Sequence, residues 1–316
     1  MGQQESGAKQ QTGCGEYAAE GARARVRLVA LLPGYRPDGK EPQRGARKER
    51  MAHRSRALDR LRGAALLNMI VYHGCYDMVY MFGHSWEWFG TPAAWLWQQV
   101  GCWIFIVLSG YCWSLGRRHF RRGAIVLLAG ALISVITAVC MPEEAVRFGI
   151  LTMLGSCTLL MLLIAPLAER IAPETGLLGS AILFLATRNV SQGYFGIGLG
   201  GPTGSIPLLS LPQSWYRGAL GAWLGFPPPE FASSDYFPLL PWGFLFLAGY
   251  YLYGVLKKRR PKGGGSKAST EMGTAWPERM LCFLGRYSLV VYLLHQPLLY
   301  GILYLWTMAS ERAMYY

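Results

Sequence analysis

The sequence predicts an all-α bundle of helices that crosses a membrane about seven times. The chain of 316 residues is 52% hydrophobic and only 16% charged, whereas soluble proteins average about 25% charged residues. Several apolar segments are longer than the roughly 17–20 residues that a helix needs to cross a bilayer. The distribution of basic residues is the third observation, and it sets the orientation.

The 31 Lys and Arg residues give the chain a net charge of +13. Fourteen of them lie in residues 1–62, and most of the others lie in "GRRHFRR" (116–122) and "KKRRPKGGGSK" (257–267). Such clusters between apolar runs are typical of cytoplasmic loops under the positive-inside rule. We therefore expect the lipid bilayer as a partner, a cytoplasmic N-terminus and no nucleic acid.

The expected elements follow from composition in chain order. Residues 1–50 are rich in Gly, Gln, Arg and Lys without periodicity, which predicts a disordered basic cytoplasmic extension. Residues 51–316 form the predicted membrane domain, and Met51 could be the true start of the protein. The apolar runs predict spans over 58–82, 94–115, 123–141, 147–166, 176–187, 237–256 and 283–307.

Seven crossings agree with the charge bias. With the N-terminus inside, only four basic residues fall on the outer side, which leaves 31 − 4 = 27 on the inner side. The segment 188–236 is apolar but broken by Gly and Pro. Such backbone at membrane depth is tolerated only against protein or water, so we expect re-entrant pieces or an external cap there.

Ionisable residues within the predicted spans are the first candidates for a functional site, because they are costly in lipid. His73 and Asp77 are four residues apart, which places them on one face of a helix within contact range. A carboxylate beside an imidazole can orient it for acid–base work. The alternative is a buried pair that ties neighbouring helices together.

Arg62 precedes His73 by 11 residues, so the two point almost the same way, about 16 Å apart along a helix. Arg62 would then lie at the cytoplasmic mouth of a groove that ends at His73. A long ligand with an anionic head at Arg62 could present its far end to His73. Alternatively, Arg62 is an inner anchor whose side chain reaches the membrane surface.

Three further sites carry two interpretations each. His295, followed by Gln296 and Pro297, could contact substrate or pack helices. His84, in "GHSW", is favoured as a member of an interfacial aromatic belt. Asp235 could cap a helix or bind the acceptor.

The sequence carries no sign of a metal site or a phosphate loop. The seven Cys residues form no CxxC pair and no Cys/His cluster with metal-ligand spacing, so we expect no metal. The stretch "GLGGPTG" (198–204) lacks the Lys-Ser/Thr of a phosphate loop. No feature of the sequence indicates an oligomeric state.

Several stretches in order resemble the catalytic-domain family of heparan-alpha-glucosaminide N-acetyltransferases and its bacterial relatives. The first is "ALDRLRGAALLNMIVYHGCYDM" (57–78), which is similar to the family's opening helix. The others are "WIFIVLSGYCWSLG", "VRFGILTMLGSCTLL", "DYFPLLPWGFLFLAGYYL" and "LGRYSLVVYLLHQPLL". The resemblance covers residues 57–308 and is more specific than any single motif.

The resemblance implies acetyl transfer across a membrane, from cytoplasmic acetyl-CoA as co-substrate to a sugar amine or hydroxyl. By position, His73 matches the histidine of the bacterial pattern, Asp77 its partner and Arg62 the arginine that opens the helix. Lysosomal members have asparagine at the His73 position and a later reactive histidine, close to the place of His84. The reactive imidazole is therefore either His73 or His84.

The resulting hypothesis is an acyltransferase of a bacterial cytoplasmic membrane with a cell-envelope glycan as acceptor. One imidazole of the first span acts as general base or carries the acetyl group, and Asp77 orients His73. His295, Gln296 and Asp235 approach the acceptor. The CoA phosphates are expected to bind Arg62 and the basic loop residues Arg117, Arg118, Arg121 and Arg122.

The rival hypothesis is a transporter or flippase in which the His/Asp pair relays protons. Transporters often show internal symmetry between halves, and the sequence shows none.

Overall fold

The structure is a computed structural model that describes residues 41–259 and 276–314. The chain divides into two units, Met1–Ser55 and Arg56–Tyr316, and every side-chain contact below belongs to the second. Residues 1–40, the larger part of the predicted extension, lie outside the described residues. Helix α2 begins at Glu41, so the predicted domain boundary at residue 50 falls inside a helix.

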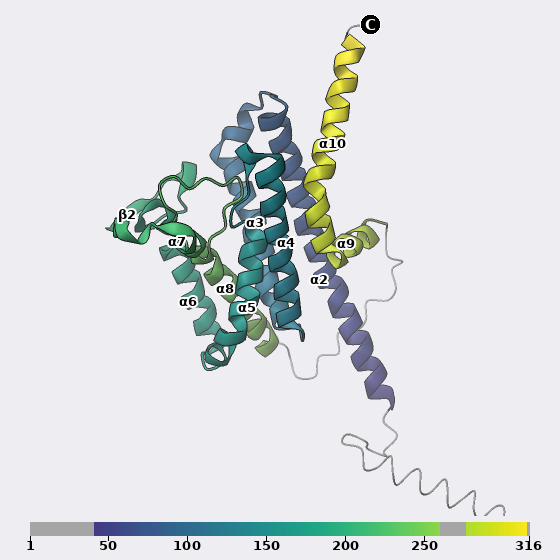
Figure 1. Ribbon diagram of the computed structural model, residues 1–316. Coiled ribbons are helices and arrows are strands. Elements are labelled where there is room, and N and C mark those ends of the chain that lie inside the picture. Colours follow the sequence, from purple (N-terminus) through teal and green to yellow (C-terminus); the bar gives the residue numbers. More distant parts are fainter. Residues whose placement is uncertain (1–40, 260–275, 315–316) are drawn as a thin grey trace, which may run out of the picture. The chain divides into compact units, whose positions relative to one another are not determined.

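Helices make up most of the described chain (Figure 1). The long ones are α2 (Glu41–Tyr76), α3 (Pro92–Trp113), α4 (His119–Cys140), α5 (Ile150–Ala168), α6 (Pro173–Ala186), α8 (Leu239–Lys258), α9 (Trp276–Arg286) and α10 (Ser288–Met314). Shorter helical turns are η1 (Asp77–Met81), η2 (Glu87–Gly90), η3 (Pro142–Glu144), η4 (Val190–Gln192), η5 (Gly201–Thr203), η6 (Gln213–Trp215) and α7 (Gly218–Leu224).

Five of the described helices are long and apolar enough to cross a membrane, namely α3, α4, α5, α8 and the Ser288–Ser310 part of α10. The predicted helical membrane bundle is confirmed, and the chain is a multi-pass membrane protein, but the count of seven spans is not confirmed. Helix α6 has 14 residues, about 21 Å, against a hydrocarbon core of about 30 Å. Helix α2 is not among the five, and it carries the charged residues Asp59, Arg60 and Arg62.

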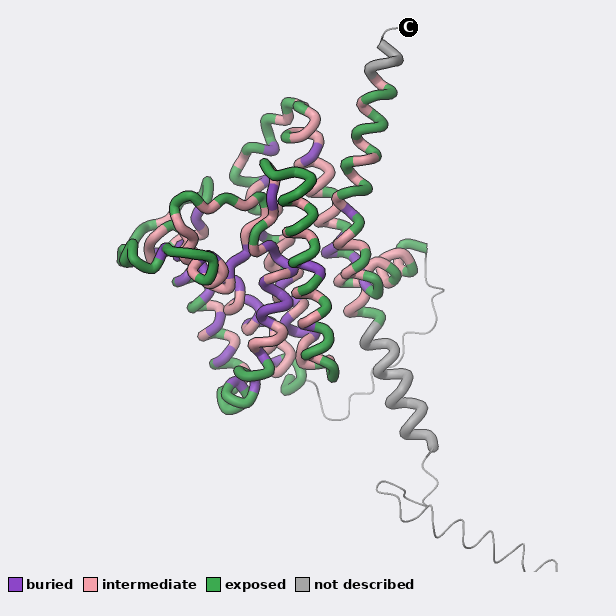
Figure 2. Tube along the Cα trace, viewed as in Figure 1, coloured by how far each residue is buried: buried purple, intermediate pink, exposed green. Residues whose placement is uncertain are grey.

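The core of the bundle lies between α3, α5 and α8. Phe246, Met153 and Ile106 are almost fully buried there and belong to one hydrophobic cluster. Half of the apolar window of α5 is buried, against 6% of that of α10. Figure 2 shows the same contrast between the buried α5 and the exposed upper part of α10. Helix α5 is therefore central, and α10 presents most of its surface to lipid.

Small residues let α3 and α8 approach each other closely. A Cβ atom added to Gly110 of α3 would lie 1.9 Å from the backbone oxygen of Phe246. A Cβ added to Gly249 of α8 would lie 2.1 Å from the backbone oxygen of Val107. Small residues serve this purpose in membrane bundles, where dispersion contacts between close backbones replace the hydrophobic effect.

The segment 188–236 adds a small two-stranded sheet to the helical bundle. It contains an antiparallel hairpin of β1 (Tyr194–Ile197) and β2 (Ile206–Ser210), with a bulge between Phe195 and Gly196. The four glycines of the 198–204 loop have positive φ angles, which glycine adopts without a steric penalty. The backbone therefore turns tightly enough to pair two strands.

The hairpin belongs to a small cap with its own core. Val190, Leu211 and Tyr216 are buried together, and the Tyr216 hydroxyl donates a hydrogen bond to the Val190 carbonyl (2.6 Å). The longest helix within 188–236 is α7, with seven residues. The segment therefore forms a small folded unit and adds no spanning helix, and its predicted place on the outer side stays a prediction.

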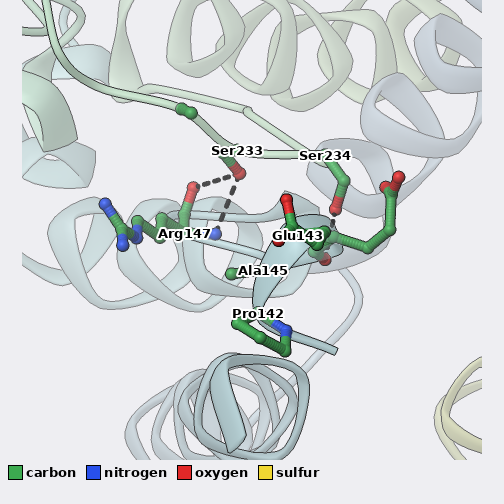
Figure 3. Close-up of a pocket in the computed structure, with 8 residues that line it drawn as sticks. Pro142, Glu143, Ala145, Arg147, Ser233 and Ser234 are labelled. Atoms are coloured by element: carbon green, nitrogen blue, oxygen red, sulfur yellow. Dashed lines mark hydrogen bonds between the residues drawn. The ribbon is translucent and has the colours of Figure 1, made fainter. Parts of the chain in front are cut away.

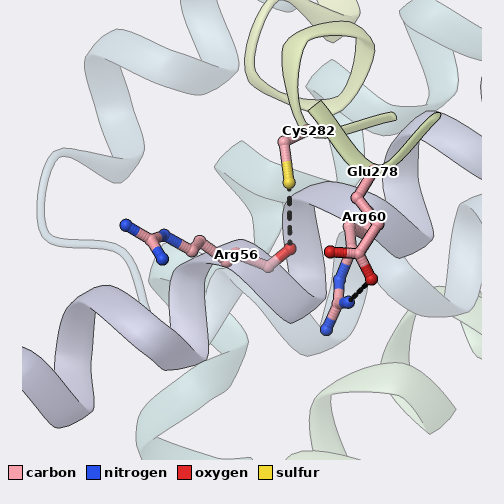
Figure 4. A network of polar contacts seen from close by, with 4 residues as sticks. All are labelled: Arg56, Arg60, Glu278 and Cys282. Carbon is pink, nitrogen blue, oxygen red and sulfur yellow. Dashed lines mark hydrogen bonds and ion pairs between the residues drawn. The ribbon is translucent and has the colours of Figure 1, made fainter. Parts of the chain in front are cut away.

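Helix α9 lies against residues 56–63 of α2. A Cβ on Gly63 of α2 would meet the Leu281 backbone, and one on Gly285 of α9 would meet the Asp59 backbone. Figure 4 shows the ion pair between Arg60 and Glu278 (2.8 Å) and the contact of the Cys282 thiol with the Arg56 carbonyl. We call this end of the bundle, with its basic residues, the inner end, following the charge distribution.

Candidate active site

Helix α2 changes its winding where the candidate residues lie. The α-helical hydrogen bonding ends at Tyr76, and residues Asp77–Met81 form a π-helical turn. Short π-helical segments occur frequently at functional sites. Asp77, the first residue of the turn, has no exposed surface. The chain thus places a carboxyl group in the interior at a local irregularity of the helix.

The carboxyl group of Asp77 is bound to α10. Gln296 donates a hydrogen bond from Nε2 to Asp77 Oδ1 (2.7 Å). The second oxygen of each side chain, Asp77 Oδ2 and Gln296 Oε1, is buried without a hydrogen-bond partner in the described part of the chain. Buried polar atoms of this kind carry a desolvation penalty, so the pair offers two acceptors for a bound ligand.

This arrangement differs from the predicted one, in which Asp77 orients His73. Among the hydrogen bonds of the described residues, none joins Asp77 to His73. The hydrogen-bond donor to Asp77 comes from α10, which contacts α2 at this level.

His73 instead faces the second predicted histidine. The ring centroids of His73 and His295 are 5.1 Å apart, with an angle of 63° between the ring planes. The two imidazoles come from α2 and α10, which are separated by about two hundred residues in the sequence. The structure therefore brings His73, Asp77, His295 and Gln296 together, the four polar residues predicted in the first and last spans.

The hydrogen bonding of His295 determines its tautomer. Its Nδ1 lies 2.5 Å from the backbone carbonyl oxygen of Tyr292. A carbonyl oxygen only accepts, so Nδ1 carries the hydrogen, and Nε2 of the neutral ring has a free lone pair. Nε2 is buried and has no partner among the described residues. His295 is thus prepared to accept a proton.

Tyr292 extends the site one turn towards the start of α10. Its ring lies 5.3 Å from that of His295 and stacks on Phe105 of α3 at 6.3 Å. Asp235, which precedes α8, lies within electrostatic range of Tyr292 and of Cys102. The predicted acceptor residue Asp235 is thus linked to the imidazole pair only through Tyr292, which contacts His295.

Asp235 also has a structural role that the sequence offered as the alternative. Its Oδ2 accepts a hydrogen bond from the backbone N–H of Ile150 (3.1 Å), the first residue of α5. It thus caps α5 and not the helix that follows it. A carboxylate at a helix N-terminus satisfies a backbone donor that has no intrahelical partner.

The burial of Asp235 predicts a dependence of stability on pH. Burial raises the pKa of this carboxyl group to about 6, against the lowering effect of the Ile150 hydrogen bond. Because the folded pKa is above the unfolded value, the folded state holds the proton more tightly between about pH 4 and 6, so stability falls as pH rises through this window. Asp235→Asn keeps an oxygen for the cap and removes the buried charge.

We expect Asp235→Asn to raise the stability at pH 7.5 by roughly 1–2 kcal/mol and to flatten the pH dependence between pH 4 and 6. Thermal unfolding of the detergent-solubilised protein across this range measures both effects. An unchanged slope in the variant would contradict this assignment.

Two polar residues that follow α6, Arg188 and Asn189, were not predicted as part of a site. Arg188, placed after α6, donates a short hydrogen bond to Gln99 of α3, and its guanidinium lies 4.5 Å from the ring centroid of Trp242. Asn189 is fully buried, and its Oδ1 has no partner among the described residues. The sequence signal for these residues was their position directly after an apolar run. Arg188 was counted only as one of the basic residues on the outer side.

The predicted cofactor residues lie at the inner end. Arg62 lies 3.8 Å from Asp59 and beside the Cys112 thiol of α3, and Arg122 is within electrostatic range of the same thiol. Arg117, Arg118 and Arg121 are exposed around the start of α4. Two of the five predicted arginines thus flank the inner end of α3.

Arg62 and His73 lie on the same face of α2, and this narrow face is called the strip of α2 below. Residues that face α3, such as Asn68 through its hydrogen bond with Trp97 (2.8 Å), lie on one side of this strip. Gly63 and Gly74, which face α9 and α10, lie on the other. The helix is continuous between residues 62 and 73, so the predicted axial separation of about 16 Å applies.

His84 lies apart from the imidazole pair. Its ring is 6.2 Å from that of Trp306 of α10 and 6.5 Å from that of Trp86. Its Nδ1 is buried without a partner in the described segments. Its neighbours are thus aromatic rings, and its place in an interfacial belt stays a prediction.

The described residues contain no group of three or more His, Cys, Asp or Glu side chains placed to hold a metal ion.

The fold and the site define a class of protein, a multi-pass membrane protein in which two imidazoles, from α2 and α10, face each other. The family model "Heparan-alpha-glucosaminide N-acetyltransferase, catalytic" matches residues 54–297, and the chain belongs to this family. Comparison with curated proteins and with solved structures found no match. The matched range ends directly after Gln296 and so includes the whole of the site. Family membership indicates an acetyltransferase.

Proposed function

We propose that this protein transfers an acetyl group from acetyl-CoA on the inner side of a bacterial cytoplasmic membrane to an amine or hydroxyl of an envelope glycan on the outer side. The N-terminus lies in the cytoplasm in this proposal. The observation that supports it best is the imidazole pair His73–His295, in which His295 Nε2 has a free lone pair in a buried position.

The donor would bind at the inner end. Guanidinium groups bind phosphates through charge-assisted hydrogen bonds, and Arg62 and Arg122 flank one point at the inner end of α3. The exposed residues Arg117, Arg118 and Arg121 would attract the remaining CoA phosphates. The pantetheine arm could then follow the strip of α2 from Arg62 towards His73, so that the thioester reaches the imidazoles.

The acceptor would approach from the outer end. His295 Nε2 accepts a proton from the acceptor amine or hydroxyl as that group attacks the thioester carbonyl. The new amide or ester bond forms, the carbon–sulfur bond breaks, and the proton passes to the CoA sulfur. His73, beside His295, is placed to bind the acetyl group or to carry it transiently. Asp77 Oδ2 and Gln296 Oε1 would accept hydrogen bonds from the acceptor.

The test is transfer of label from acetyl-CoA by the purified protein in vesicles. Acetyl-CoA labelled in the acetyl group is supplied on the side of the basic loops, and an amino sugar or a hydroxylated glycan on the other side. Label in the glycan supports acetyl transfer. Solute movement without label incorporation supports the transporter hypothesis and rejects the proposal.

His84→Ala separates the two candidate histidines of the first helix. Because His84 packs against Trp306 and away from the pair, we expect this variant to keep at least a third of the wild-type kcat. Initial rates at saturating acetyl-CoA measure it. If His84→Ala loses activity by a hundredfold or more while remaining folded, His84 and not His73 carries the chemistry.

A further inference from the structure

An apolar groove lies beside α4 at the outer half of the bundle. Its volume is about 670 Å³, and it is enclosed by α4, the start of α5, α7 and residues 228–231. One face of α4 forms part of its wall, because the lining residues follow one another at helical spacing. They are Leu127, then Ala131, then Ser134 and Val135. Cavities of 300–1,000 Å³ are the size of small-molecule binding sites.

A polar pocket adjoins this groove. It has a volume of about 240 Å³ and lies between η3 and the segment 232–234, with Glu143, Glu144, Ser233 and Ser234 in its wall. Figure 3 shows Ser233 hydrogen-bonded to the backbone of Arg147, with Glu143 on the other side of the pocket. Arg147 lines both cavities, so the polar and the apolar space meet at one cation.

The groove is accessible from the bilayer. Leu128, Leu132 and Val135 of α4 are 69%, 54% and 61% exposed, and α4 is one of the five helices that can cross a membrane. Their exposed side chains therefore face hydrocarbon. A lipid chain could enter the groove sideways without passing through water.

The polar pocket is connected to the segment of Asp235, one of the candidate acceptor residues. Glu144 lies within electrostatic range of Tyr76, the residue before Asp77. The Ser233 hydroxyl donates a hydrogen bond to the Asp235 carbonyl (3.1 Å), and Asp235 lies within electrostatic range of Tyr292. A head group in this pocket would therefore lie beside the segment that carries Asp235.

We infer that the acceptor is a lipid-linked sugar of the outer leaflet, with its hydrocarbon chain in the α4 groove and its sugar in the adjoining polar pocket. This inference rests on the proposed acetyl transfer and specifies the acceptor class. The carboxylates of Glu143 and Glu144 accept hydrogen bonds from sugar hydroxyls or an ammonium group. Arg147 stands where a phosphate between chain and sugar would lie.

The test compares two ligands with the same sugar and different tails, methyl glucosaminide and a dodecyl glucosaminide that carries a diazirine in its chain. The full-length protein in nanodiscs is photolysed with the diazirine compound in the absence of acetyl-CoA, and labelled peptides are identified by mass spectrometry. We expect labelling within 127–135 and 218–231 and no competition by a tenfold excess of methyl glucosaminide. A diazirine-tailed phosphatidylcholine should label these peptides at least fivefold less.

Ala131→Phe fills the groove, and Leu128→Phe is its matched control, an exposed position of the same helix outside the groove wall. We expect Ala131→Phe to reduce the groove labelling at least fivefold and Leu128→Phe to leave it unchanged. Labelling spread evenly over the lipid-facing helices, equal labelling by the phosphatidylcholine, or no effect of Ala131→Phe overturns the inference. Because labelling needs no acetyl transfer, groove labelling by a protein that never acetylates the ligand would reject the proposed function alone.

Discussion

Replacing His295 by alanine is expected to lower kcat for acetyl transfer at least a hundredfold while the protein remains folded. His295 Nε2 is the buried acceptor whose tautomer is set by the Tyr292 carbonyl, and general base catalysis contributes roughly 10²–10⁴-fold. Initial rates at saturating acetyl-CoA and acceptor measure the loss.

His73→Ala should give a loss of similar size, and the double variant should lose little more than either single variant, because groups that act as a unit are not additive. His84→Ala is the matched histidine control. If both His73→Ala and His295→Ala keep more than a tenth of the wild-type rate, the imidazole pair is a packing contact between α2 and α10, and the reaction must occur elsewhere.

Replacing Gly249 by leucine is expected to destabilise the bundle by at least about 3 kcal/mol, because inserting bulk into packed cores commonly costs 1–3 kcal/mol and more where backbones touch. The Cβ of any other residue at this position would lie 2.1 Å from the backbone oxygen of Val107. A backbone atom cannot move aside as a flexible side chain can. Thermal unfolding of the solubilised variant, followed by circular dichroism, measures the loss.

The control is Gly301→Leu, because Gly301 of the membrane helix α10 has nothing within 4 Å of an added Cβ. We expect this variant to melt within about 2 °C of the wild type, since exposed substitutions are usually within ±0.5 kcal/mol. If Gly249→Leu melted as high as Gly301→Leu, the α3–α8 contact would not hold the bundle together.

The candidate site could be predicted in its parts but not in its pairing. His73, Asp77, His295 and Gln296 stood out because polar groups in apolar runs are costly. The i,i+4 spacing of His73 and Asp77 suggested a pair within one helix, whereas the structure pairs Asp77 with Gln296 and His73 with His295. The spacing could not reveal the partner, because the partner comes from a helix more than two hundred positions away.

The contacts of Arg188 with other helices could not be predicted from the sequence. A basic residue at the end of an apolar run reads as a topology signal, and Arg188 was counted in this way. In the structure it lies against Trp242 and Gln99. Only the folding of the 188–236 segment onto the bundle gives such a residue a place in the interior.

The sequence alone determined that this chain is a bundle of membrane helices with an acetyltransferase-type catalytic domain, and which of its polar residues deserve study. The bundle could be predicted because solvation in lipid acts on every residue separately and leaves its mark in composition and order, whereas the acetyltransferase assignment rested on the resemblance of several stretches to a known family. The tertiary structure alone decided which polar groups meet, that α3 and α8 touch through glycines, and that 188–236 folds as a hairpin cap beside an apolar groove. These features depend on contacts between distant segments, and a contact free energy belongs to a pair of residues and not to either one.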